Sequence, residues 1–169
     1  MNYKTGKARA IKFIWILAAV LWMALIFRYS GQRAQVSSEL SGSLSYRLAG
    51  RVSEWFSLGL GEETLMHYGE IWEHPLRKAA HMTEYAILSA LFFGNFYQYT
   101  TTYQRKYFLA WICATCYAAT DEFHQLFVEG RSGQITDVCI DSAGAFVGLC
   151  FVYLVLWMLN NVLHEADDK

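Results

Sequence analysis

Charge is scarce in this sequence. Asp, Glu, Lys and Arg make up 17% of the 169 residues and hydrophobic residues 54%, whereas soluble domains usually carry roughly 25% charged residues. The formal net charge of -1 leaves no basic excess of the kind that binds nucleic acid, so we exclude a nucleic-acid partner. Proline is nearly absent too: Pro75 stands alone, and no glycine- or serine-rich linker divides the chain. These absences predict one domain, residues 1–169, in a lipid environment.

The sequence contains four long apolar segments. The first, residues 13–27, has no charge and is flanked by Lys12 and Arg28, whose side chains can extend it to spanning length. A cleaved signal peptide is the alternative, but two tryptophans interrupt the segment and no small-x-small site follows it. Pro75 suits the first turn of the second helix. We predict an all-α, polytopic membrane protein with spans at about 11–29, 76–97, 107–127 and 136–159.

The segment between the first two spans predicts an amphipathic helix. Apolar residues recur in it at helical spacing, with polar and charged residues between them: Leu40, Leu44, Leu48, Val52, Trp55 and Phe56. Such a helix can lie at the membrane interface with its apolar stripe among the headgroups, or pack on the end of the bundle as a cap. The sequence leaves both arrangements open.

Basic residues favour a cytoplasmic location for both termini of a multi-pass protein of the cell membrane. They crowd the N-terminus and the short loop between the second and third spans: Lys4, Lys7, Arg9, Lys12, Arg105 and Lys106. The long segment after the first span also carries arginines, so the prediction depends on the density of charge beside the first helix. That segment is then extracytoplasmic.

Ionisable residues gather at one end of the predicted bundle. With four alternating spans, the long segment and the turn at 128–135 lie on one side of the membrane, so three helix ends converge there. Within about two turns of that surface lie His81, Glu84, Asp121, Glu122, Gln125, Arg131, Asp137 and Asp141. Polar residues in such positions are candidates for function by default.

Helical spacing assigns these residues to faces. Lys78, His81 and Glu84 form one stripe of the second span. Asp137 and Asp141 share a stripe with Gly144 and Gly148, a small-residue pair suited to close helix contact. We therefore expect the two aspartates to point into the bundle rather than toward lipid.

Carboxylates outnumber cations in this cluster. Buried acids without partners would take up protons or recruit a cation, because an intramembrane charge is costly. A structural alternative explains part of the cluster: Asp137 can satisfy free amides at a helix start, and Arg131 can fix the turn by pairing with Glu129 or Asp137. That alternative explains two or three residues well and the whole set poorly.

The chain resembles the VanZ-like family of bacterial membrane proteins in four strings: LWMALIFRYSGQ (21–32), SSELSG (37–42), RKAAHMTEYAIL (77–88) and DEFHQLFVEGRSGQITDVCIDSAGAFVG (121–148). By position, the family pattern falls on Lys78, His81, Glu84, Tyr85, Asp121, Glu122, Gln125, Gly130, Arg131, Ser132, Asp137, Asp141, Gly144 and Gly148. The family is named for a protein linked to teicoplanin resistance in Gram-positive bacteria. The resemblance thus implies a membrane topology and an envelope role more than a reaction.

Two functions of different classes follow. In the first, the protein binds or modulates a membrane lipid headgroup or a lipid-linked cell-wall precursor and so lowers the access of a lipid-anchored glycopeptide. Arg131 and Lys78 would meet phosphate. The ligand-binding candidates are Lys78, Arg131, Ser132 and Asp137.

The second function is a membrane-embedded enzyme acting on an envelope lipid or another phosphate-bearing substrate. His81, Glu84, Glu122 and Asp141 would hold a divalent cation or share acid–base work, and Mg, Mn, Ca and Zn all suit such ligands. No G-x-S-x-G or H-E-x-x-H motif is present. The catalytic candidates are His81, Glu84, Asp121, Glu122, Gln125 and Asp141.

Overall fold

The computed structural model describes residues 3–99 and 102–167, with side chains described for 6–99 and 102–163. Helices form nearly all of this part of the chain and no strand occurs in it, which confirms the all-α prediction. In chain order the helices are α1 (Tyr3–Ser30), α2 (Ala34–Trp55), α3 (Glu62–Tyr97), α4 (Tyr103–Gln125) and α5 (Ile135–Asp167).

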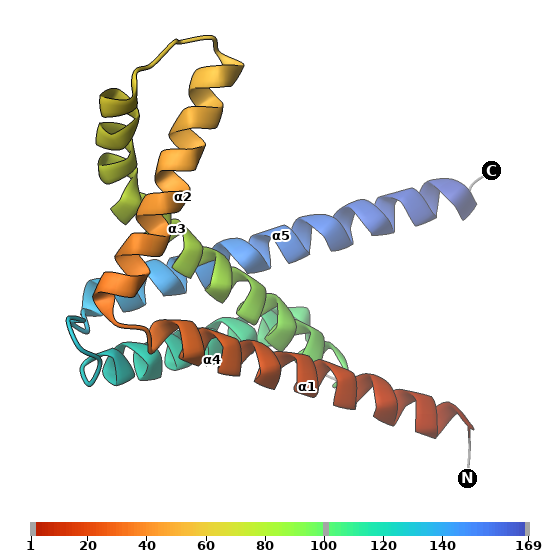
Figure 1. Cartoon of the computed structure of the whole chain (residues 1–169). Helices are drawn as coiled ribbons and strands as arrows, with labels where there is room; N and C mark the ends of the chain where they lie inside the picture. The colour runs from red at the N-terminus through yellow and green to blue at the C-terminus, as the bar shows by residue number, and fades with distance from the viewer. Residues whose placement is uncertain (1–2, 100–101, 168–169) are drawn as a thin grey trace.

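The central element of the fold is α3, which packs against each of the other four helices. Figure 1 shows α1, α4, α5 and the C-terminal part of α3 lying together and running alternately in opposite directions. Within the described residues α1 and α5 do not contact each other, so α3 faces the opening between them. The ends of α1 and α4, the middle of α3 and the start of α5 therefore meet at one end of the bundle.

The small-residue stripe of α5 packs on the backbone of α3. A Cβ atom added at Gly144 would collide with the backbone of Met82, and one added at Gly148 would collide with that of Ala86. One turn further along, Ser89 Oγ donates to the Ala145 carbonyl over 2.8 Å. This close contact confirms the interface predicted from the glycine pair, and it turns Asp141 inward, where only 2% of the residue is exposed.

Three hydrogen bonds from side chains to backbone carbonyls hold α1 against α3 and α4. Trp22 Nε1 donates to the Glu84 carbonyl on α3 over 2.9 Å. Closer to the start of α1, the Trp15 carbonyl accepts from Asn95 Nδ2 at 3.0 Å, and Tyr117 Oη on α4 donates to the Met23 carbonyl over 2.6 Å. These contacts fix α1 antiparallel to α3.

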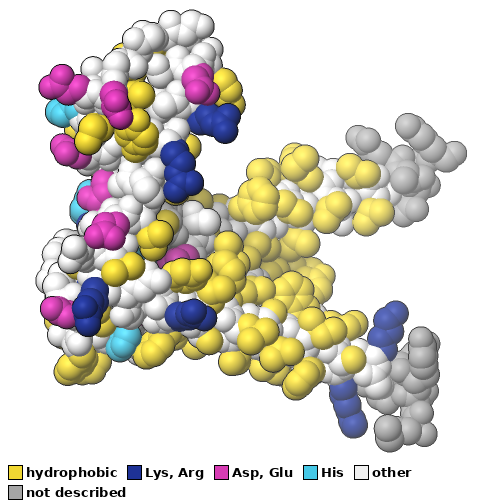
Figure 2. Space-filling view, viewed as in Figure 1, with side chains coloured by type: hydrophobic (Ala, Val, Ile, Leu, Met, Phe, Trp, Pro, Cys, Tyr) yellow, Lys and Arg dark blue, Asp and Glu magenta, His cyan; other side chains and the backbone are white. Residues whose placement is uncertain are grey.

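The outer surface of the bundle is apolar. Two helical segments, Gly6–Ser30 and Ile135–Leu163, are long and apolar enough to cross a membrane, and only 11% and 22% of their most apolar windows are buried. Figure 2 shows hydrophobic side chains along the bundle and acidic ones gathered on the α2–α3 side, with basic side chains there and at the N-terminal end of α1. A core helix of a soluble protein would be mostly buried instead, so these faces are suited to lipid.

Tyrosine and lysine mark the opposite end of the bundle. The Lys106 ammonium lies 4.7 Å from the ring centroid of Tyr97 and 5.0 Å from that of Tyr103. The ammonium of Lys12 lies 4.7 Å from the Tyr99 ring. Aromatic and basic side chains of this kind are enriched at the boundary between membrane and water.

Helix α3 does not begin at Pro75, and the prediction that it does is wrong. The helix starts at Glu62 and continues through Pro75, and Figure 1 shows it turning in this region from the α2 hairpin into the bundle. The N-terminal part of α3 is held by α2: Glu73 Oε1 accepts from Ser41 Oγ at 2.9 Å, and Arg77 Nη1 donates to Ser38 Oγ over 2.9 Å. This tertiary packing outweighs the usual cost of an interior proline.

The predicted amphipathic helix is α2, and among the helices it packs on α3 alone. Its small residues face α3, as shown by the burial of Ser45, Ala49 and Ser53. Most of the predicted apolar stripe is exposed, at Leu40, Leu44, Leu48, Trp55 and Phe56. Because α2 has no packing contact with α1, α4 or α5, most of its length projects away from the bundle, as Figure 1 shows.

Candidate functional site

The loop from residue 126 to 134 joins α4 to α5 and is bound to the turn after α1 and to the end of α4. Arg131 Nε donates to the Gln32 carbonyl over 3.1 Å, and the Gln134 amide donates to Glu122 Oε2 over 2.9 Å. Gly130 has a φ of 76°, a left-handed conformation that glycine adopts without strain. The loop thereby holds Arg131 over the polar end of the bundle.

A polar cavity of about 190 Å³ lies beneath this loop. Side chains from α2, α3, the C-terminus of α4, the loop and the start of α5 surround it, and we use the name polar cavity for this space. Its lining residues are Ala34, Ser37, Ser38, His74, Arg77, Lys78, His81, Gln125, Gly130, Arg131, Ser132, Gln134 and Asp137.

A second cavity, of about 210 Å³, adjoins the first and shares Ser37, Arg77, His81 and Arg131 with it. We call it the amphipathic cavity, because the shared polar residues face an apolar wall. That wall consists mainly of Leu40, Leu44, Leu76 and Ala80, and Glu84 completes the side toward the bundle.

Three cations line the polar cavity, and two of them have carboxylate partners. Lys78 pairs with Asp137, and Arg77 pairs with Glu73 over 2.8 Å while also donating to Ser38 Oγ over 2.9 Å. In the described part of the chain Arg131 forms no ion pair; it donates to the Gln32 carbonyl and to Gln125 Oε1, the latter over 3.4 Å. Arg131 therefore keeps its charge available to a ligand.

The environment of Arg131 is suited to an anion. Burial is the main cause that lowers the pKa of this guanidinium, and the nearby positive charge of Arg77 lowers it further, while the carboxylates of Asp121, Glu122 and Glu84 raise it in part. An anion in the cavity would relieve both effects by pairing with the charge. Asp137 is the one carboxylate among the lining residues of this cavity, so cations outnumber carboxylates there, and the other acids of the predicted cluster lie outside its lining.

Three carboxylates lie buried behind the cavity wall. Asp121, Glu122 and Asp141 are 2%, 6% and 2% exposed. Asp121 Oδ2 accepts from Gln125 Nε2 at 3.4 Å, while Asp121 Oδ1 has no partner within the described residues. Two further buried hydroxyls, of Ser30 and Tyr85, also have no partner there. The predicted inward orientation of Asp141 is confirmed, and none of the three carboxylates lines the polar cavity.

His81 and Glu84 form a pair on α3, with His81 Nδ1 3.4 Å from Glu84 Oε2. His81 lines both cavities and Glu84 lines the amphipathic one. Within the described residues no group of three or more His, Cys, Asp or Glu side chains could hold a metal ion. The candidate metal ligands His81, Glu84, Glu122 and Asp141 are thus not brought into one ligand set, because Glu122 is held behind the wall by the Gln134 amide.

The model of the VanZ/LLP1 family matches residues 15–158 of this chain. The chain belongs to the VanZ/LLP1 family. No curated protein and no solved structure matches it. The match confirms the resemblance seen in the four sequence strings, and together with the lipid-suited helix faces it identifies a membrane protein of a family associated with glycopeptide resistance.

Most of the VanZ-like pattern maps to the polar end. Lys78, His81, Gln125, Arg131, Ser132 and Asp137 line the polar cavity, and Ser132 Oγ accepts from Gln134 Nε2 at 3.2 Å. Gly144 and Gly148 hold α5 against α3. The pattern of this VanZ/LLP1 protein therefore combines cavity-lining residues with residues that support them.

Sequence reasoning missed part of the cavity wall. Ser37 and Ser38 lie in the SSELSG string that resembles the family, so a signal for them existed. Arg77 and His74 were not among the predicted site residues, although both line the cavity. Of these two, His74 is exposed. The α2–α3 hairpin brings all four to the site, and its packing was not visible in the sequence.

Proposed function

We propose that this VanZ/LLP1 protein spans the membrane four times and binds the phosphate-bearing headgroup of an envelope lipid, or of a lipid-linked cell-wall precursor, in its polar cavity. Residues 76–97 of α3 are about 22 in number, which gives a helix of roughly 33 Å, enough for a membrane of about 30 Å. That part of α3 and α4 lie between the apolar helices α1 and α5. A membrane around α1 and α5 would therefore enclose all four.

The orientation that fits best has both termini in the cytoplasm and the polar cavity outside. Basic residues collect at the end of the bundle opposite the cavity: Lys7, Arg9, Lys12, Arg105 and Lys106. In this orientation the loop with Arg131 faces the cell envelope. The apolar stripe of α2 would then rest on the outer membrane–water interface.

The observation that carries the proposal is Arg131, a half-buried guanidinium without a carboxylate partner among the described residues, beside Arg77 and Lys78. Arginine offers a planar set of donors that matches phosphate oxygens, and lysine adds a point charge. Serine hydroxyls of Ser37, Ser38 and Ser132 on the same wall can donate to further oxygens. The cavity thus provides charge and directional donors for a phosphate group.

Headgroup binding supports an envelope-modulating role. A lipid or precursor held by the protein is withdrawn from the membrane surface that a lipid-anchored glycopeptide of the teicoplanin type approaches. We propose that expression of the protein lowers teicoplanin susceptibility through this withdrawal. The family association points the same way.

The direct test compares Arg131→Gln with wild-type protein and with Arg33→Gln. Arg33 is an exposed residue that pairs with Glu129 over 3.3 Å and does not line the cavity. Binding of phosphatidylglycerol by the purified protein in detergent, measured by native mass spectrometry, should fall for Arg131→Gln and stay unchanged for Arg33→Gln. Equal binding by all three proteins would reject headgroup binding in this cavity.

A second candidate function is acid–base catalysis on the bound lipid. The His81–Glu84 pair favours it, because an imidazole beside a carboxylate at the edge of both cavities has the geometry of a general base with an orienting partner. Incubation of the protein with radiolabelled phosphatidylglycerol tests this function. A water-soluble product that is lost in His81→Gln would establish it.

A further inference from the structure

The amphipathic cavity continues along α3 toward an apolar groove. Ala80, Glu84, Ile87 and Leu91 follow one another at three- or four-residue spacing, so they lie on one face of α3. Ala80 and Glu84 line the amphipathic cavity, and Ile87 and Leu91 line the groove, which has a volume of about 790 Å³. One face of α3 therefore lines both the amphipathic cavity and the apolar groove.

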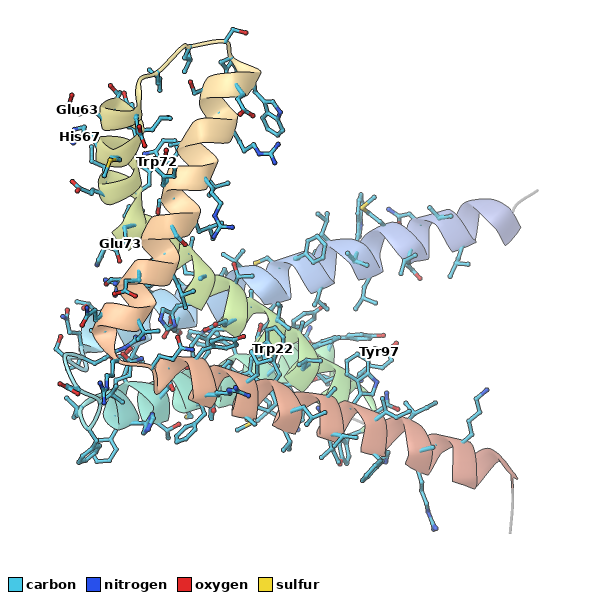
Figure 3. The ribbon with its side chains drawn as sticks, in the orientation of Figure 1. Trp22, Glu63, His67, Trp72, Glu73 and Tyr97 are labelled. Atoms are coloured by element: carbon cyan, nitrogen blue, oxygen red, sulfur yellow. The ribbon has the colours of Figure 1, made fainter. Side chains whose placement is uncertain are left out.

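The groove lies in the opening between α1 and α5. Trp15 of α1 forms one wall, and Val147 and Phe151 of α5 form the other. Figure 1 shows α1 and α5 diverging on either side of α3, and the space-filling view has hydrophobic side chains along both. Trp22, labelled in Figure 3, donates to the Glu84 carbonyl and so fixes α1 beside the junction of cavity and groove. In the described chain α1 and α5 do not contact each other.

The dimensions of this path match those of one leaflet of a membrane. From Ala80 to Leu91 the helix rises roughly 16 Å. Half of a hydrocarbon core of about 30 Å is nearly the same length. A lipid whose phosphate lies beside Arg131 would thus have its chain at the depth of the groove.

We infer that the groove holds the hydrocarbon chain of the lipid whose headgroup occupies the polar cavity, so that the protein selects an anionic amphiphile over a soluble phosphate. The inference rests on the proposed headgroup function of the cavity. Two observations support it beyond that function: the cavity and the groove share one face of α3, and the groove walls are apolar throughout. The hydrocarbon chain of the lipid adds binding affinity, and the three cations of the polar cavity select a headgroup of negative charge.

The test separates chain binding from headgroup binding. Val147 is 57% exposed on the α5 wall, so Val147→Trp fills the groove with little change to the core. Cys150→Trp is the matched control, because Cys150 is an exposed residue of the same helix that lines a different apolar groove, between α4 and α5. The probes are dipalmitoyl phosphatidylglycerol and glycerol 3-phosphate, which shares the phosphate and has no chains.

For full-length protein in detergent, we expect Val147→Trp to weaken phosphatidylglycerol binding about tenfold, since it removes apolar contact comparable to one buried side chain. Glycerol 3-phosphate binding should not change, and Cys150→Trp should affect neither probe. If Val147→Trp is not monodisperse, Ile87→Trp on the α3 wall replaces it. Unchanged lipid binding in the groove variant, or an equal loss in Cys150→Trp, overturns the inference.

The same experiment distinguishes this inference from the proposed function. Arg131→Gln should weaken the binding of both probes, because both carry the phosphate. If Arg131→Gln weakens neither, headgroup binding in the cavity is wrong and the chain inference falls with it. If Arg131→Gln weakens both while Val147→Trp weakens neither, the cavity function stands and the groove does not hold the chain.

Discussion

Lys78 on α3 and Asp137 in the first turn of α5 form an ion pair at the wall of the polar cavity. The carboxylate neutralises one of the three cavity cations, so it opposes the binding of an anion. It also lies where negative charge stabilises a helix N-terminus. The pair thus links the stability of the fold to the charge of the site.

Asp137→Asn should therefore strengthen anionic lipid binding while lowering stability. Loss of the pair and of the favourable helix-terminus charge should reduce the free energy of unfolding by about 1 kcal/mol. Phosphatidylglycerol binding and thermal unfolding, measured on one protein preparation, test the two effects together. Weaker lipid binding in Asp137→Asn would show that the carboxylate contacts the ligand rather than restraining Lys78.

The contact between α3 and α5 should not tolerate a larger side chain. Gly148→Leu would push a branched side chain into the backbone of Ala86, and overpacking of this kind costs about 1–3 kcal/mol or more. We expect a clear loss of folded protein in membranes. Ala143→Leu is the control, because Ala143 is exposed on the same helix and its variant should accumulate like wild type. Equal abundance of the two variants would contradict the packing argument.

The sequence predicted the interior of the bundle better than its polar surface. Gly144 and Gly148 predicted a close helix contact, which is the interface between α5 and α3, because a small-residue stripe allows two helix backbones to approach closely. The buried position of Asp141 followed from the same helical spacing. These features are local to one helix, and helical periodicity records them directly.

The features that could not be predicted from the sequence depend on contacts between segments that are far apart in the chain. Pro75 is typical of a helix start, and only the packing of α2 on α3 keeps the helix continuous through it. The charge count near the cluster predicted an excess of acids that would take up protons or recruit a cation, but a count cannot show that buried carboxylates such as Asp121 lie behind the wall while Arg77 and Arg131 line it. The ligand preference of the cavity is a property of the tertiary structure.

Neutralising the buried carboxylates should separate binding from catalysis. Glu122→Gln and Asp141→Asn keep the size of the side chain, and the amide oxygen that Glu122→Gln introduces can still accept from the Gln134 amide. We expect both variants to be folded and to bind phosphatidylglycerol as wild type does, because neither residue lines the cavity. If these acids take part in a reaction, both variants should lose any turnover of lipid that the wild-type protein shows.

The teicoplanin susceptibility of cells that express each of these two variants is measured alongside lipid binding. Wild-type protection by both variants at wild-type abundance would leave the buried acids a structural role only. Loss of protection with intact lipid binding would show that binding alone does not explain the phenotype, and it would favour the acid–base alternative. The two readouts together therefore decide whether the buried acids take part in the function, while His81→Gln tests the acid–base alternative itself.

The apolar stripe of α2 should lie on the membrane surface. Leu48 belongs to this stripe and is 39% exposed. A spin label at Leu48 in lipid nanodiscs should be relaxed more strongly by oxygen, which partitions into lipid, than by a water-soluble nickel complex. A label at Glu70, an exposed residue on the α3 side of the hairpin, should show the opposite preference. Stronger relaxation by the nickel complex at both sites would place the hairpin clear of the membrane and contradict the prediction.

The loop that carries Arg131 should be reachable from outside the cell. Ser132 is exposed at the rim of the cavity, and Arg105 is exposed near the start of α4, at the opposite end of the bundle. In a variant without the four native cysteines, Ser132→Cys should react with a membrane-impermeant maleimide in intact cells. Arg105→Cys should react only after the cells are permeabilised. Four spans place these two residues on opposite sides, so labelling of both in intact cells would contradict the span count. Labelling of Arg105→Cys alone would keep the four spans and reverse their orientation, which would turn the polar cavity toward the cytoplasm and remove the link to an external glycopeptide.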